Sequence, residues 1–158
     1  MSDVERPATA GASAAAGASG ERFDPARFFE LARRVGHGRA LGMEFGAAGD
    51  NWTELSLPWR AELVGVPDSG ILASGAIVSL IDTASGTAVW ATLGKFVPLV
   101  TLDLRIDYLR PAVEGESVYA RCECTKLTSR IAFTRGTAHV GDPAKPIAYS
   151  AGTFMIGS

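Results

Sequence analysis

The 158-residue sequence contains only two cysteines, Cys122 and Cys124, and only two histidines, His37 and His139. On a strand, cysteines two residues apart point to the same face of one chain, so neither a local disulfide nor a zinc site is expected there. We interpret both as reduced thiols that pack in the interior. Because structural disulfides form mainly in oxidising compartments, this interpretation fits a cytoplasmic protein.

The sequence also lacks a strong excess of charge of either sign. Its formal net charge is −2, with 20% charged residues, which gives no general field that would attract a nucleic acid or a membrane surface. No run of apolar residues reaches the length expected of a transmembrane helix. Hydrophobic residues make up 47% of the chain. That is enough to build a core, and the length is typical of one domain.

The first twenty residues offer little that could pack, because they are mainly Ala, Gly, Ser and Thr with scattered charge. They lack the basic start and the strongly apolar core of a signal peptide. Their composition is typical of a disordered segment. We therefore expect a disordered tail at residues 1–20 and one folded domain at residues 21–158.

The stretch around which the chain is organised is residues 70–93, with the sequence GILASGAIVSLIDTASGTAVWATL. Apolar residues recur with helical spacing and small residues fill most other positions. This pattern predicts a buried helix over Gly75–Leu93, roughly 28 Å long. Asp82 is the only charged residue between Asp68 and Lys95, and an unpaired buried carboxylate is costly. Either Asp82 hydrogen-bonds a neighbouring loop or backbone amide, or it is a carboxylate poised at a cleft.

The remaining sequence predicts one short helix and six strands. Asp24 is a good N-cap residue and Pro25 suits the first helical position, so a helix is expected over residues 23–35, with a loop from Gly38. Alternating apolar and polar residues between turn signals predict strands at 40–47, 52–58, 97–108, 117–127, 131–140 and 146–156, the last four following one another as hairpins. The prediction is an α+β fold in which one antiparallel sheet wraps around the central helix.

Three segments carry a resemblance to a known family: residues 68–90, the run YLRPA at Tyr108–Ala112, and the run SAGTF at Ser150–Phe154. Together they resemble the PaaI-like acyl-CoA thioesterases of the hotdog superfamily, over roughly residues 40–156. The resemblance implies a hotdog fold and hydrolysis of an acyl- or aryl-CoA thioester. It implies no cofactor, since coenzyme A enters only as part of the substrate.

The family has a His-Gly-Gly motif at the start of the central helix, where this chain has Ala73, Ser74 and Gly75. Thioester hydrolysis needs a base or nucleophile, which Asp82 can supply, and donors for the oxyanion, which the free N–H groups of Ser74 and Gly75 can supply. Eight residues separate Ser74 from Asp82, roughly 12 Å along one helix, so one carbonyl cannot contact both. We therefore expect a homodimer, or a dimer of dimers, with active sites at the dimer interface, as the resemblance also implies.

The resemblance places a hydroxyl that holds the attacking water at Thr101, although a strand threonine chosen for its β propensity is an equal interpretation. Strict alternation in strand 97–108 puts Leu102, Leu104 and Ile106 on one face and Thr101 on the other. Ala73, at the position of the motif histidine, is expected to lie against the substrate.

The coenzyme A phosphates could be bound by Arg130, Lys126 and Arg135, since the family places basic residues near the turn that contains Arg130. Taken singly, each is better interpreted as a solvated surface charge. Trp90 and Phe96 could line the acyl pocket or pack in the core.

Two other functions remain open. A hotdog hydratase or dehydratase needs a histidine paired with an acid, but His37 and His139 both lie outside the central helix. A non-catalytic acyl-CoA binding protein is favoured by the missing motif histidine. Hydrolysis of a panel of acyl-CoAs separates these functions from a thioesterase.

Deletion of residues 1–20 should leave the yield of folded protein and the enzymatic activity unchanged, because the segment has few side chains able to bury apolar surface. The comparison is between the purified full-length and truncated proteins. A large loss of either quantity on truncation would show that the tail is part of the folded unit.

Overall fold

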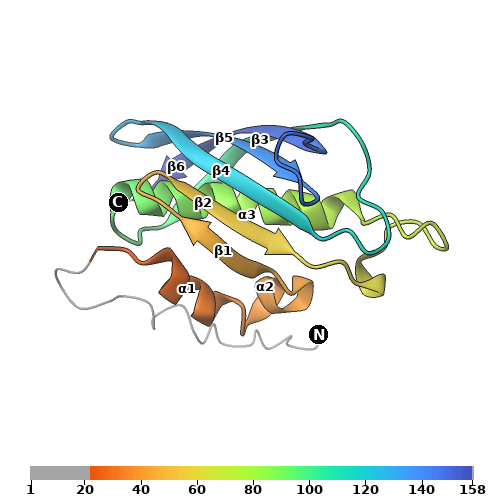
Figure 1. Cartoon of the computed structure of the whole chain (residues 1–158). Coiled ribbons are helices and arrows are strands. Elements are labelled where there is room, and N and C mark those ends of the chain that lie inside the picture. The colour runs from red at the N-terminus through yellow and green to blue at the C-terminus, as the bar shows by residue number, and fades with distance from the viewer. Residues whose placement is uncertain (1–21, 158) are drawn as a thin grey trace, which may run out of the picture.

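The structure is a computed structural model that describes residues 22–157, and the tail predicted at residues 1–20 lies outside this range. The sheet curves over one long helix, and two short helices lie below its first strand (Figure 1). The elements in chain order are α1 (Pro25–Ala32), α2 (Gly36–Leu41), β1 (Glu44–Ala48), β2 (Trp52–Leu57), a 3-10 turn (Ala61–Leu63), α3 (Ser74–Leu93), β3 (Leu99–Tyr108), β4 (Val118–Leu127), β5 (Ile131–His139) and β6 (Ala148–Ile156). The predicted α+β fold is confirmed.

The six strands form one antiparallel sheet in the order β1-β2-β4-β5-β6-β3. The predicted hairpin succession of the last four strands is wrong at its first step, because β3 pairs with β6 and not with β4. The chain leaves β3 beside the start of β6, where the Leu109 N–H donates to the Ile147 carbonyl at 2.8 Å. It then passes the start of α3, where the Leu72 N–H donates to the Ala112 carbonyl at 3.1 Å. Strand β3 therefore ends up as an edge of the sheet.

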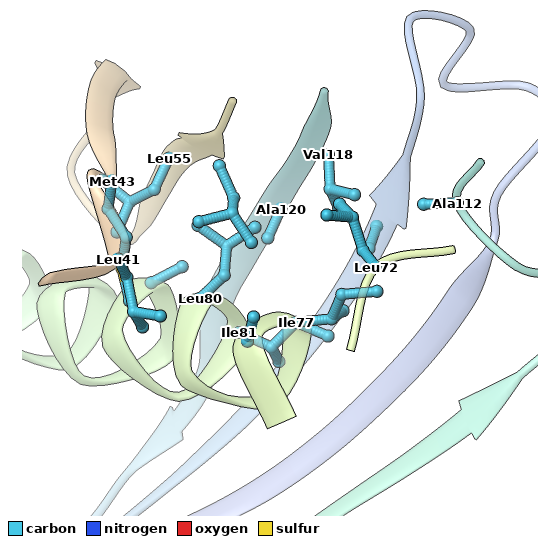
Figure 2. Packing of buried hydrophobic residues seen from close by; sticks show 14 of the residues in the cluster. Leu41, Met43, Leu55, Leu72, Ile77, Leu80, Ile81, Ala112, Val118 and Ala120 are labelled. Carbon is cyan, nitrogen blue, oxygen red and sulfur yellow. The ribbon is translucent and has the colours of Figure 1, made fainter. Parts of the chain in front are cut away.

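Helix α3 packs its apolar face beneath the sheet. Ile77, Leu80 and Ile81 project from it toward Leu55 of β2 and Val118 of β4 (Figure 2). Ten of its twenty residues are buried. By length and composition alone α3 could also cross a membrane, but 56% of its most apolar window is buried inside the fold, as in the core helix of a globular domain.

One face of α3 is not covered by the sheet. Ser74, Gly75 and Val78 are exposed, Val78 to 38%, and Asp82 and Gly86 further along are half-buried. The expectation of a buried helix is therefore wrong for this strip.

The N-terminal region differs most from the prediction. The Asp24 carboxylate caps α1 as expected, accepting from the N–H groups of Ala26 and Arg27. However, α2 occupies residues expected to be loop and strand, so β1 begins at Glu44 and not at Ala40. Its sequence, GHGRAL, contains two glycines and predicts no helix by propensity. Burial of Leu41 at its end, next to the core, outweighs that preference.

Both cysteines are buried, reduced and within the sheet, as predicted. The Cys122 thiol donates a long hydrogen bond to the Ile81 carbonyl, 3.7 Å away, which ties β4 to α3. Burial raises the pKa of Cys122 from its ordinary value near 9 to about 11, and it also raises the pKa of Cys124.

Because only the unfolded chain readily forms the Cys122 thiolate, the stability that this thiol supports should be intact below about pH 9 and lost between about pH 9 and 11. The free energy of unfolding, measured by urea denaturation across this range, should fall less steeply in Cys122→Ala than in the wild type.

At pH 8 a water-soluble disulfide reagent should react with both cysteine thiols only as fast as the protein unfolds. Immediate reaction of both would contradict their burial.

Candidate active site

The site is centred on a hydrogen bond between α3 and β3. The Thr101 hydroxyl donates to Asp82 Oδ1 over 2.9 Å. Both residues were candidates from the sequence, and the structure brings them together. Asp82 is half-buried, because the open strip of α3 leaves one side of it uncovered.

A β-bulge in β3 turns Thr101 toward the helix. Thr101 pairs with Phe154 of β6, whereas the next paired residue is Asp103, opposite Thr153, so Leu102 is the extra residue. The predicted strict alternation was therefore wrong, since the bulge shifts the phase of the strand. Leu102 is 53% exposed, and Thr101 takes the face toward α3. A bulge beside a site re-aims a side chain in this way.

Asp82 and Thr101 open into a cavity of about 290 Å³ between α3, β3 and the α1–α2 segment. Most of its wall is apolar. The residues that line it are Phe28, Phe29, Ala32, Arg33, His37, Gly38, Met43, Asp82, Thr83, Gly86, Trp90, Leu99, Thr101 and Phe154. The arrangement places a carboxylate and a hydroxyl beside a space that can hold an apolar group.

The two aromatic candidates from the sequence separate. Trp90 lines the cavity. Its indole N–H donates a hydrogen bond to the Val97 carbonyl at 2.7 Å. Phe96 does not line the cavity. It packs against Trp90, with ring centroids 4.6 Å apart, and both rings contact Phe23 and Phe28. Phe96 therefore supports the cavity wall from behind.

His37 was missed as a site residue. It lies on α2, and its Nε2 is 3.0 Å from the Ser79 hydroxyl on α3. That hydroxyl in turn donates to the Gly75 carbonyl at 3.0 Å, so Nε2 carries the proton in this arrangement. No local pattern pointed to His37, because its partner lies 42 residues away and the helix that carries it, α2, was not predicted.

The start of α3 presents free backbone donors. Ala73 is the N-cap residue, and no side chain caps the helix. A Cβ added at Gly75 would meet no atom within 4 Å, so the space beside this amide is open. The Tyr108 hydroxyl fixes the first turn by donating to the Ser74 carbonyl at 3.1 Å, and partial burial raises the pKa of Tyr108. Since α3 runs unbroken from Ser74 through Asp82, the backbone donors at Ser74 and the predicted base Asp82 are roughly 12 Å apart along the helix axis.

The three basic candidates do not gather around Asp82 in one chain. Arg130 is exposed in the β4–β5 turn, where its carbonyl accepts from the Ile156 N–H at 2.8 Å. Lys126 is also exposed, near the end of β4. Arg135 lies opposite Glu123 on the outer face of the sheet, away from α3. Among residues 22–157 no group of His, Cys, Asp and Glu side chains could hold a metal ion.

Comparisons with known proteins identify the family and the fold. The family model described as "Thioesterase superfamily" matches residues 69–147. The Escherichia coli K12 protein named medium/long-chain acyl-CoA thioesterase YigI is 30% identical over 132 residues, which cover 75% of this chain and 84% of YigI.

Solved structures of similar proteins share this fold over most of the chain. A Pseudomonas aeruginosa protein of 41% identity superposes with a TM-score of 0.72, covering 83% of this chain and 96% of that one. A Haemophilus influenzae thioesterase of 25% identity superposes with a TM-score of 0.76, covering 87% and 93%.

Replacing Tyr108 with Phe should lower the free energy of unfolding by about 1 kcal/mol, because the Ser74 carbonyl loses its side-chain donor. Tyr149→Phe is the matched control, since its ring is 48% exposed and its hydroxyl makes no hydrogen bond within residues 22–157. Urea denaturation of both variants checks the expectation. Equal stabilities would mean that Tyr108 does not anchor the helix start.

Proposed function

Because the chain belongs to the thioesterase superfamily, we propose that it hydrolyses an acyl-CoA thioester to the free acid and coenzyme A, in a site completed by a second copy of the chain. The observation that carries this proposal is the Asp82–Thr101 hydrogen bond at the edge of an apolar cavity. The name of the Escherichia coli relative favours medium or long acyl chains as the substrate class.

The proposed chemistry uses Asp82 as the base. The single proton of the Thr101 hydroxyl is donated to Asp82 Oδ1, so the hydroxyl oxygen can accept a hydrogen bond from a water. Asp82 Oδ2 then takes a proton from that water as the water oxygen attacks the thioester carbonyl carbon. The C–S bond breaks and the coenzyme A thiolate leaves, taking up a proton. Direct attack by the carboxylate is the variant of this scheme in which Asp82 is the nucleophile.

The oxyanion donors in this proposal are the N–H groups of Ser74 and Gly75 at the positive end of α3. The same chain cannot bring them to the carbonyl at Asp82, because the helix holds them apart. A second α3, antiparallel to the first and facing its open strip, places one helix start beside the other Asp82.

Two features of residues 22–157 support such a dimer. The strip of α3 around Val78 is uncovered. Strand β3, ten residues long, is an edge of the sheet and pairs only with β6. Its Val100 and Leu102 are 51% and 53% exposed, and a long apolar edge of this kind is a template for pairing with another chain.

The hydratase or dehydratase alternative loses support at both histidines. His37 contacts the Ser79 hydroxyl and not Asp82. His139 is buried and stacks on Tyr119, with ring centroids 5.5 Å apart, and it does not line the cavity. Neither forms the histidine–acid pair that such chemistry needs.

Asp82→Asn should lower kcat for acyl-CoA hydrolysis by about a hundredfold or more, since it removes a positioned base but keeps an acceptor for Thr101. The melting temperature should hold or rise. Asp107→Asn is the matched control: Asp107 also accepts side-chain hydrogen bonds, from Arg105, but does not line the cavity. A destabilised Asp82→Asn protein with near-normal kcat would make Asp82 a structural residue and refute the proposal.

Thr101→Val should lower kcat by about tenfold, the scale of one lost hydrogen bond in the transition state, and Thr101→Ser should restore most of it. The valine is isosteric and suits a strand, so the melting temperature should change little. If serine and valine reduce kcat equally, the hydroxyl has no part in the reaction.

A further inference from the structure

We infer, on the basis of the proposed function, that Gly86 sets how far an acyl chain can extend along α3, and that the pocket accepts acyl groups whose distal end is a hydrocarbon. Nothing in the proposed chemistry uses Gly86. The inference comes from its place in the cavity wall.

Asp82, Gly86 and Trp90 lie four residues apart on α3 and all three line the cavity. Residues at this spacing share one face of a helix. An acyl chain whose carbonyl carbon lies at Asp82 therefore reaches Gly86 after roughly 6 Å and Trp90 after roughly 12 Å. Gly86 is the midpoint of that path.

Packing within the chain does not require glycine at this position. A Cβ added at Gly86 would meet only Phe154 Cε1, at 3.9 Å, an ordinary van der Waals contact. By contrast, a Cβ at Gly136 would collide with Cys122 Sγ. Glycine inside a helix is less favourable than alanine, because it loses more backbone entropy on folding. The missing side chain of Gly86 therefore keeps space in the cavity at the expense of helix stability.

Within residues 22–157, the far end of the path at Trp90 offers no free polar group. The Trp90 indole N–H is already bonded to the Val97 carbonyl, the Phe28 ring packs against Trp90, and Leu99 and Phe154 add apolar surface to the same cavity. A hydroxyl or carboxylate at the end of the acyl chain would lose its water there without a new partner, which costs free energy. The geometry thus selects for hydrocarbon chains.

The test compares Gly86→Ala and Gly86→Leu with the wild type on butyryl-, octanoyl- and dodecanoyl-CoA. Both substitutions improve helix propensity, so the variants should fold and the alanine variant should melt at a higher temperature. For butyryl-CoA, kcat/KM should stay within about twofold, because the short chain ends before Gly86. For the longer substrates the leucine variant should lose about fourfold in kcat/KM for each methylene kept out of the pocket, and the alanine variant less.

Thr92→Ala is the control, because it also replaces a residue of α3 by a better helix former but lies outside the cavity wall. It should leave the chain-length profile unchanged. Equal losses of Gly86→Leu on all three substrates would overturn the inference. So would a change of molecular mass in solution, because Gly86 would then serve subunit contact. Dodecanedioyl-CoA, whose distal carboxylate would reach Trp90, should be hydrolysed more slowly than dodecanoyl-CoA, and equal rates would refute the hydrocarbon end.

A binding measurement separates this inference from the proposed function. Calorimetric titration with dodecanoate should give weaker binding to Gly86→Leu than to the wild type and to Thr92→Ala. If the wild type hydrolyses no acyl-CoA but this difference in dodecanoate binding is present, the proposed function is refuted and the inference that Gly86 limits the acyl pocket is supported. If dodecanoate binds all three proteins equally, the inference about Gly86 fails whatever the hydrolysis data show.

Discussion

The constraint on which the structure depends is the rigidity of α3. A continuous helix holds the backbone donors at Ser74 and the carboxylate of Asp82 two turns apart, and no bending of the chain can bring both to one carbonyl. The sheet covers one face of this helix and leaves the other open. The free helix start, the open strip and the unpaired edge of β3 are the three features that the second copy in our proposal would complete.

The parts of the fold that depend on local chemistry could be predicted from the sequence. The Asp24 cap, the span of α3 and the positions of β2, β4 and β5 follow from residues close together in the chain. The pairing of β3 with β6 could not be predicted, since it joins segments about forty residues apart and follows from the route taken by the connection after β3. Helix α2 could not either, because the contact of Leu41 with the core outweighs a sequence poor in helix formers.

The residues of the candidate site also fall into those that could be predicted from the sequence and those that could not. Asp82 stood out because it is a single charge in an apolar helix, and the resemblance to hotdog thioesterases pointed to Thr101. Their hydrogen bond depends on a bulge at Leu102 that alternation alone would not reveal. His37 and Gly86 gained meaning only from the cavity, whose walls come from α1, α2, α3 and two strands. The basic residues expected near coenzyme A do not line the cavity that contains Asp82, and their proposed contact with coenzyme A stays a prediction.

The shared site is tested most directly by combining two inactive variants. Ser74→Pro removes one proposed oxyanion donor at the first helical position, where proline is tolerated, and the extended backbone of Ala73 suits the residue before it. Asp82→Asn removes the base from the other end of the helix. A heterodimer of the two, isolated with a different tag on each chain, has one doubly altered site and one intact site. It should regain about half of the wild-type activity. Activity no higher than that of either parent variant would contradict a site built from two subunits.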